Sequence, residues 1–89
     1  MRHGRRDLRH KSIVQALRDA GRIVIDLADL GGGVPDLLVL WGGGMRLLEV
    51  KSPGGKLTPD QERLFPQLGA RVVVVRSVEE ALAATGVRA

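Results

Sequence analysis

Two short apolar runs joined by glycines constrain the fold of this chain more than any other feature. Residues 36–41 have the sequence DLLVLW and residues 45–51 have the sequence MRLLEVK, with three glycines between them. Runs of this length, rich in leucine and valine, are typical of strands, and a short glycine-rich connection between two strands predicts a β-hairpin. We therefore expect residues 36–51 to form an antiparallel pair.

The segment before this hairpin predicts one helix and one strand. Apolar residues in 8–20 recur at helical spacing on one face, and Gly21 follows as a helix stop. Residues 22–27 are rich in β-branched side chains, which favours a strand. Three consecutive glycines in 29–33 then predict a turn or a close approach of the backbone.

A capping box predicts where the next helix begins. Thr58 suits the N-cap, Pro59 suits the first helical position, and Gln61 suits the third position. The helix should run to about residue 68, and Pro66 inside it should kink or shorten it.

The end of the chain predicts a strand and a last helix. Residues 71–76 contain four consecutive valines, which favours a buried strand, and Ser77 with Glu80 forms a second capping box that opens a helix over 77–84. The predicted order is α-β-β-β-α-β-α, an α/β fold with one mixed sheet flanked by helices. The strand at 71–76 should pair in parallel through a right-handed crossover, within one domain over residues 1–89.

Composition excludes several classes of protein. The chain has no cysteine, which excludes disulfides and thiolate metal sites. Its apolar runs are far shorter than the ~18 residues of a membrane span, and no apolar stretch follows the basic N-terminus as in a secretory signal, so a cytoplasmic location is expected. A chain of 89 residues is marginally stable alone, which favours a homodimer.

Positive charge is concentrated at the N-terminus. Residues 1–11 carry five basic residues against Asp7, a net charge of +4, so the rest of the chain sums to zero. Such an arm can hold a phosphate backbone, and a solvated, flexible terminus over residues 1–7 would show the same pattern.

Charged residues at the open end of the hairpin are the candidates for a functional site. Glu49 and Lys51 alternate along a strand and so share one face, and Asp36 begins the neighbouring strand. A turn centred near Gly43 puts Asp36 opposite Val50, so a register shift of one residue would place it beside Glu49 or Lys51. Two carboxylates with a lysine suit Mg²⁺ or Mn²⁺, or they form a cross-strand salt bridge at a sheet edge.

A metal ion held there would polarise a phosphate and lower the pKa of a bound water, while the lysine would orient that water or stabilise developing charge.

Two other kinds of site are rejected. Lys56 follows two glycines but lacks the spacing of a nucleotide-binding phosphate loop. His3 and His10 have no third zinc ligand near them in the sequence.

Several of these segments together resemble a known nuclease signature. The sequence GVPDLL at 33–38, followed by LEVK at 48–51, resembles the PD-(D/E)XK nuclease superfamily. The longer stretch EVKSPGGKLTPDQ at 49–61 and the sequence VVVVRS at 72–77 are similar to the VRR-NUC branch, which includes small stand-alone phage and bacterial nucleases. The similarity covers nearly the whole chain, from about residue 5 to residue 86.

The resemblance implies a restriction-endonuclease-like α-β-β-β-α-β core and a role for each matching residue. Asp36 and Glu49 would bind Mg²⁺ or Mn²⁺ together with the carbonyl of Val50, Lys51 would be the catalytic lysine, and Gln61 would be the glutamine that this branch places on the following helix. The expected activity is cleavage of branched or structured DNA, such as a junction or a flap, by a homodimer.

One departure from the family pattern opens an alternative. Many relatives carry a metal-binding glutamate in the first helix, whereas the best-matching position here is Ser12, a poor ligand for hard cations. Asp19 lies two turns further along, and Asp7 is also a poor match. The alternative is a degenerate nuclease fold that binds structured DNA without cutting it. A purely structural dimerisation domain would leave the charged residues of the hairpin unexplained.

Overall fold

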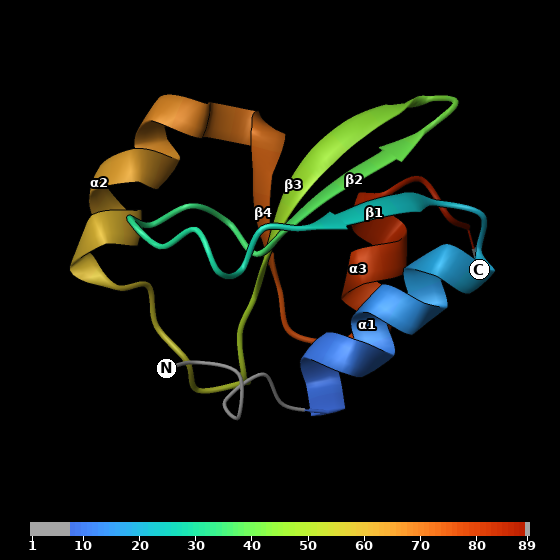
Figure 1. Ribbon diagram of the computed structural model, residues 1–89, viewed down its shortest axis with the longest axis horizontal. Coiled ribbons are helices and arrows are strands. Elements are labelled where there is room, and N and C mark those ends of the chain that lie inside the picture. The colour runs from blue at the N-terminus through green and yellow to red at the C-terminus, as the bar shows by residue number, and fades with distance from the viewer. Residues whose placement is uncertain (1–7, 89) are drawn as a thin grey trace.

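The computed structural model describes residues 8–88 and confirms the predicted order of helices and strands (Figure 1). The elements are α1 (Leu8–Asp19), β1 (Ile23–Asp26), β2 (Leu37–Trp41), β3 (Gly44–Val50), α2 (Pro59–Leu68), the 3₁₀ turn η2 (Gly69–Arg71), β4 (Val72–Val75) and α3 (Val78–Ala84).

One four-stranded mixed sheet, in the order β1-β2-β3-β4, forms the centre of the fold. The strands β1, β2 and β3 pair in antiparallel fashion, and β4 joins β3 in parallel, as its crossover through α2 predicts. This mixed sheet with its helices is the α/β architecture of the restriction-endonuclease-like fold.

The helices lie on two sides of the sheet. The helices α1 and α3 pack together against one face, and α2 stands on the opposite side, next to η2 and β4 (Figure 1). The buried core lies between the sheet and the α1–α3 pair. Its members are Ile13, Leu17, Val24, Leu37, Val39, Leu48, Val75 and Ala81.

The register of the hairpin corrects the sequence prediction by one residue. Trp41 pairs with Gly44, so the turn consists of Gly42 and Gly43 and is not centred on Gly43. The pairing then runs to Leu37 opposite Leu48, so the position preceding β2 faces Glu49 rather than Val50. A two-residue turn is the tightest common hairpin connection, and its length alone decides this register.

The helix α2 ends at Leu68, as predicted, and it runs through Pro66 without being shortened there. One further expectation is corrected. The predicted buried strand is an edge strand, and of its four valines only Val75 is buried while the others are half-buried. Among residues 8–88, no helix has the length and apolar character needed to cross a membrane.

Candidate active site

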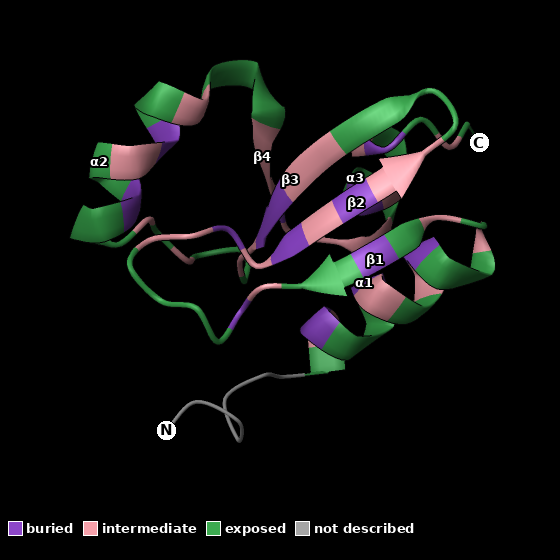
Figure 2. Cartoon of the chain, turned by 45° about the horizontal axis from the view of Figure 1, so that its top comes forward, coloured by how far each residue is buried: buried purple, intermediate pink, exposed green. Residues whose placement is uncertain are grey.

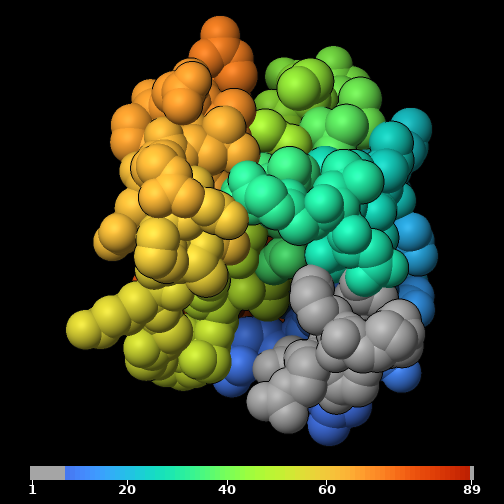
Figure 3. Space-filling view, turned by 60° about the vertical axis from the view of Figure 1, so that its left-hand side comes forward, coloured from blue at the N-terminus to red at the C-terminus, as the bar shows by residue number. Residues whose placement is uncertain are grey.

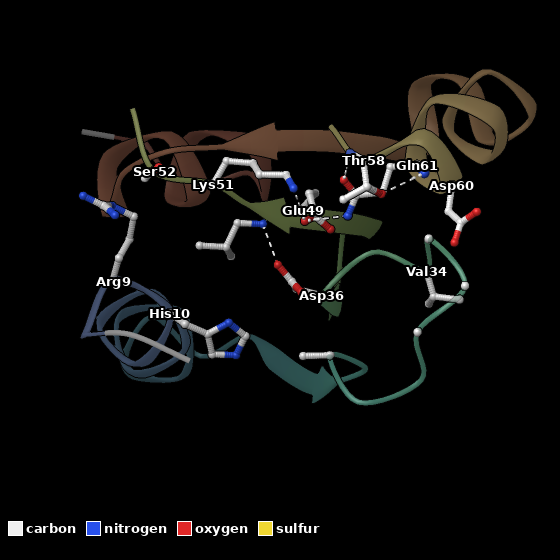
Figure 4. Close-up of a pocket in the computed structure, with 15 residues that line it drawn as sticks. Arg9, His10, Val34, Asp36, Glu49, Lys51, Ser52, Thr58, Asp60 and Gln61 are labelled. Carbon is white, nitrogen blue, oxygen red and sulfur yellow. Dashed lines mark hydrogen bonds and ion pairs between the residues drawn. The ribbon is translucent and has the colours of Figure 1, made fainter. Parts of the chain in front are cut away.

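A pocket of about 470 Å³ opens where the strand ends meet the starts of α1 and α2 (Figure 4). In the space-filling view its mouth appears as a hollow between the 50–57 segment and the loop before β2 (Figure 3). The residues predicted for the site all line this pocket. They are Asp36, Glu49, Val50, Lys51 and Gln61.

Glu49 lies at the back of the pocket and is only 3% exposed. Its Oε2 accepts a hydrogen bond from Gln61 Nε2 at 2.9 Å and lies 3.3 Å from Lys51 Nζ. Its other oxygen, Oε1, is also buried and has no hydrogen-bond partner among the residues that the structure describes. A buried carboxylate oxygen without a partner is costly, so this atom is poised for a ligand.

The electrostatics of the pocket disfavour an ionised Glu49. Burial is the largest cause that raises the pKa of its carboxyl above the usual 4.5, and the nearby charge of Asp36 raises it further. The Lys51 ammonium and the Gln61 amide act in the opposite direction without cancelling the increase. The two carboxylates therefore repel each other in a desolvated pocket, and a cation between them would relieve that repulsion.

Asp36 is held at the mouth of the pocket by the backbone of the neighbouring strand. The amide of Val50 donates a hydrogen bond to Asp36 Oδ2 at 2.9 Å. This bond turns the carboxylate toward the end of β3, on the side where Glu49 and Lys51 emerge (Figure 4). The observed register of the hairpin puts Asp36 opposite Glu49, one residue from the position expected for a turn centred on Gly43. Both carboxylates therefore lie in one pocket.

Gln61 performs two structural tasks with one side-chain conformation. Its Oε1 accepts a hydrogen bond from the backbone N–H of Thr58 at 2.9 Å, and the backbone N–H of Gln61 donates to Thr58 Oγ1 at 3.2 Å, which completes the predicted capping box. Its Nε2 then points inward to Glu49. The start of α2 is therefore tied directly to the buried carboxylate.

The first helix faces the pocket with residues that the sequence prediction did not single out. Ser12 is exposed and does not line the pocket, whereas Arg9 and His10 do. His10 Nε2 lies 2.9 Å from Asp26 Oδ2, and Asp26 Oδ1 accepts from the Ala28 amide at 2.9 Å. The spacing of buried residues 10, 13 and 17 on α1 was the available signal, since it puts the histidine on the core side.

The number of acidic ligands is small. Asp19 lies at the far end of α1, and Asp7 falls outside the described residues. Within residues 8–88, no group of three His, Cys, Asp or Glu side chains is placed to hold one metal ion. Asp36, Glu49 and Asp60 line the pocket, and of these Asp36 is near enough to Glu49 to raise the pKa of its carboxyl.

Arg76 secures the loop that connects the two halves of the site. Its Nη1 donates to the carbonyl oxygens of Ser52 at 2.6 Å and Gly55 at 2.9 Å, and lies 3.4 Å from that of Pro53. This loop joins Lys51, at the end of β3, to α2, which carries Gln61. The sequence does not reveal this role, because the partners of Arg76 lie more than twenty positions away in the chain.

The glycine loop before β2 forms the opposite wall of the pocket and packs closely on α2. Gly33 has φ +85°, and a Cβ built there would lie 2.8 Å from the backbone carbonyl atoms of Asp60. Only glycine fits a positive φ at such a distance, so the close backbone approach predicted for this loop is confirmed.

The sequence of the chain matches the VRR-NUC domain over residues 3–79, a span that contains every residue predicted for the site. No curated protein matches the chain. The matched span covers most of the chain, from residue 3, ahead of α1, to residue 79 in α3. The chain therefore belongs to the VRR-NUC family of PD-(D/E)XK-like nuclease domains, whose substrate is DNA.

Proposed function

We propose that this domain, over residues 1–89, is a divalent-metal-dependent DNA endonuclease that acts on branched or structured DNA. The observation that carries the proposal is the buried, partnerless Oε1 of Glu49 in the same pocket as the Asp36 carboxylate. A hard divalent cation satisfies both features, because it supplies positive charge and coordinates carboxylate oxygens.

The residues present fit Mg²⁺ or Mn²⁺. Asp36 and Glu49 would hold the ion, and the carbonyl of Val50, which lies in the same pocket wall, would be a further ligand. A bound ion of this kind activates water and polarises the scissile phosphate. With two carboxylates, the ion would keep several water ligands, which Mg²⁺ does readily.

Lys51 and Gln61 would complete the site without binding the ion. The Lys51 ammonium projects into the pocket beside Glu49, where it can orient an attacking water and stabilise negative charge that develops on the phosphate. Gln61 donates to Glu49 and so fixes the orientation of that carboxylate. We assign Lys51 as a catalytic residue and Gln61 as a positioning residue.

The preference for junctions or flaps and the homodimeric state rest on the resemblance to small stand-alone relatives and on the small size of the chain. A symmetric pair of sites would suit a two-fold junction.

A second candidate function is binding of structured DNA without cleavage. The observation that favours it is that, among residues 8–88, no group of three His, Cys, Asp or Glu side chains is placed to hold one metal ion.

The test is cleavage of labelled four-way junction, flap and linear duplex substrates, with and without Mn²⁺. We expect cutting that requires the metal and falls by about 10²–10³-fold in Lys51→Ala, the usual cost of losing one charge-stabilising group. The matched control is Lys56→Ala, because Lys56 is exposed and lies outside the pocket. Full cleavage by Lys51→Ala would contradict the assignment, and DNA binding without cutting in any divalent metal would favour the second function.

A further inference from the structure

The imidazole of His10 lines the pocket on the side that α1 forms. His10 is 6% exposed, although the residues around it in the first turn of α1 are exposed or half-buried (Figure 2). It lines the same pocket as the carboxylates of Asp36 and Glu49. Figure 4 shows Asp36 between this ring and the ammonium of Lys51 on the far side. Histidine is the side chain that most readily exchanges a proton near neutral pH, so its place in the pocket points to proton transfer.

A carboxylate holds the ring of His10 in one orientation. The Nε2 atom of His10 lies 2.9 Å from Oδ2 of Asp26, the last residue of β1. A carboxylate can only accept a hydrogen bond, so Nε2 carries the hydrogen and Nδ1 carries the lone pair of the neutral ring. The second oxygen of Asp26 accepts from the backbone N–H of Ala28 at 2.9 Å, which fixes the carboxylate in turn. A base that is oriented by a carboxylate is a recurring arrangement in hydrolytic sites.

The attacking water must lose a proton, and the residues around Glu49 are poorly suited to accept it. The ammonium of Lys51 can orient that water but has no lone pair. Oε2 of Glu49 already accepts from Gln61 and lies 3.3 Å from the ammonium of Lys51. Oδ2 of Asp36 accepts from the backbone N–H of Val50, and both carboxylates would also hold the cation of the proposed function. An imidazole is more basic than a carboxylate, which makes His10 the better acceptor.

The size of the pocket allows His10 to act on a bound phosphodiester. A volume of about 470 Å³ holds a phosphate group and several water molecules, at roughly 30 Å³ for each water. A proton acceptor works either in direct contact with the attacking water or through one further water. Asp60 also lines the pocket, but 54% of its side chain is exposed and its carboxylate is paired with Arg63, which competes for its oxygens.

We propose that His10 is a further catalytic residue, which accepts the proton of the attacking water, and that Asp26 positions it. In this step an O–H bond of the water breaks and its oxygen forms a bond to phosphorus. The bond from phosphorus to the leaving sugar oxygen breaks, and that oxygen keeps the electron pair and takes a proton from solvent. The proton of the water goes to Nδ1 of His10. The inference rests on the cleavage activity of the proposed function and adds a proton acceptor to it.

Single-turnover cleavage in Mn²⁺ tests this role, with whichever of the labelled junction, flap and duplex the wild type cuts. We expect His10→Gln to cut about 10²–10⁴-fold more slowly, the usual contribution of a general base. Its dissociation constants for DNA in EDTA, from fluorescence anisotropy, and for Mn²⁺, from calorimetry, should stay at wild-type values. Asp26→Asn should cut about tenfold or more slowly, because an asparagine amide can donate to Nε2 and move the ring hydrogen to Nδ1.

Two exposed residues of α1 outside the pocket provide the matched controls. Ser12→Ala changes a side chain close to His10 in the same helix, and Asp19→Asn makes the same change as Asp26→Asn at the far end of the helix. Both controls should cut at the wild-type rate.

Added imidazole distinguishes a proton acceptor from a structural residue. His10→Ala leaves a space beside Asp26 that an imidazole molecule can enter, and we expect imidazole to raise the cleavage rate of this variant by about tenfold or more. Circular dichroism and thermal melting report whether the variant folds. If it does not fold, His10→Gln, which keeps a larger polar side chain, carries the test.

The outcomes separate the role of His10 from the proposed function. Folded His10→Gln that cuts at the wild-type rate would overturn the proposal, as would a folded His10→Ala that imidazole does not restore. Weaker Mn²⁺ binding by His10→Gln would also overturn it and would make the histidine a metal ligand. A wild-type chain that cuts none of the substrates in any divalent metal would refute the proposed function, and the role of His10 would fall with it.

Discussion

At the scale of single residues, the buried carboxyl of Glu49 lowers the stability of the fold at neutral pH in the pocket of the proposed active site. The carboxyl is buried beside a second carboxylate, and burial followed by that charge raises its pKa above 4.5. The folded state therefore prefers the protonated form more than the unfolded chain does. By linkage, ionised Glu49 destabilises the fold at neutral pH, and this cost disappears as the pH falls through the raised pKa toward 4.5.

Glu49→Gln is accordingly expected to stabilise the metal-free protein at neutral pH. Removing the buried charge should raise the Tm by several degrees, since ~1 kcal/mol corresponds to about 4–8 °C in a domain of this size. The difference from wild type should shrink as the pH is lowered and vanish below 4.5, where Glu49 is protonated in both the folded and the unfolded chain. Thermal melts in EDTA across this pH range provide the measurement.

The exposed Glu62 on α2 offers the matched control for this prediction. Glu62→Gln removes the same charge from solvent, so its Tm should follow wild type at every pH. A Glu49→Gln protein that is less stable than wild type at neutral pH would mean that the bonds from Lys51 and Gln61 outweigh the desolvation of the carboxylate.

At the scale of elements, the site depends on how the loop after β3 is held. This loop carries the chain from Lys51 to the capping box of α2, and its backbone carbonyls are gathered by the Arg76 guanidinium just after β4. The parallel pairing of β3 with β4 brings Arg76 to the same sheet edge as Lys51. The crossover therefore also positions Arg76, whose guanidinium holds the loop beside the site.

Arg76→Ala should loosen the loop and disturb the relation between Lys51 and Gln61. The variant loses the hydrogen bonds to Ser52 and Gly55, each worth about 1 kcal/mol. We expect faster amide hydrogen exchange over residues 52–57 and cleavage reduced by about tenfold or more through kcat, because misplacing catalytic groups by even 1 Å is costly.

The control variant for Arg76→Ala is Arg71→Ala. Arg71 is exposed and donates only to the carbonyl of Leu68 at the end of α2, away from the loop. Exchange and cleavage should stay at wild-type levels in this variant. Arg76→Ala with unchanged exchange over 52–57 would show that the loop is held by its own turn, such as the Gly55 to Ser52 backbone bond.

At the scale of the whole molecule, charge is distributed unevenly between the N-terminal arm and the body. The chain carries +4, and residues 1–11 account for all of it. Among the described residues of this segment, Arg9 and His10 lie in the first turn of α1 and line the pocket. We propose that the basic residues of the arm bind DNA phosphates and so add affinity without reading sequence.

Replacing Arg2, Arg5 and Arg6 together with glutamine should flatten the salt dependence of DNA binding. Each lost phosphate contact lowers the slope of log K against log salt by about 0.9, so a reduction of about 2–3 is expected. Fluorescence anisotropy with a labelled duplex over a salt series measures this slope. An unchanged slope would mean that the arm makes no phosphate contacts.

Local patterns were enough to predict most of the architecture. Helical periodicity located α1, and the hydroxyl, proline and glutamine at 58–61 located the start of α2 to the residue. The two apolar runs predicted the hairpin, and Glu49-Val50-Lys51 at its end predicted the candidate site. These features depend on interactions between residues a few positions apart, which a sequence displays directly.

The sequence by itself determined the order of the elements, the α/β class and the residues that gather in the pocket. Only the tertiary structure decided the hairpin register, the pocket-facing residues of α1, the partners of Arg76 and the exposure of the two isoleucines of β1. Each of these depends on contacts between segments far apart in the chain. Such contacts are set by how the packed elements fit in space, and no local propensity encodes that fit.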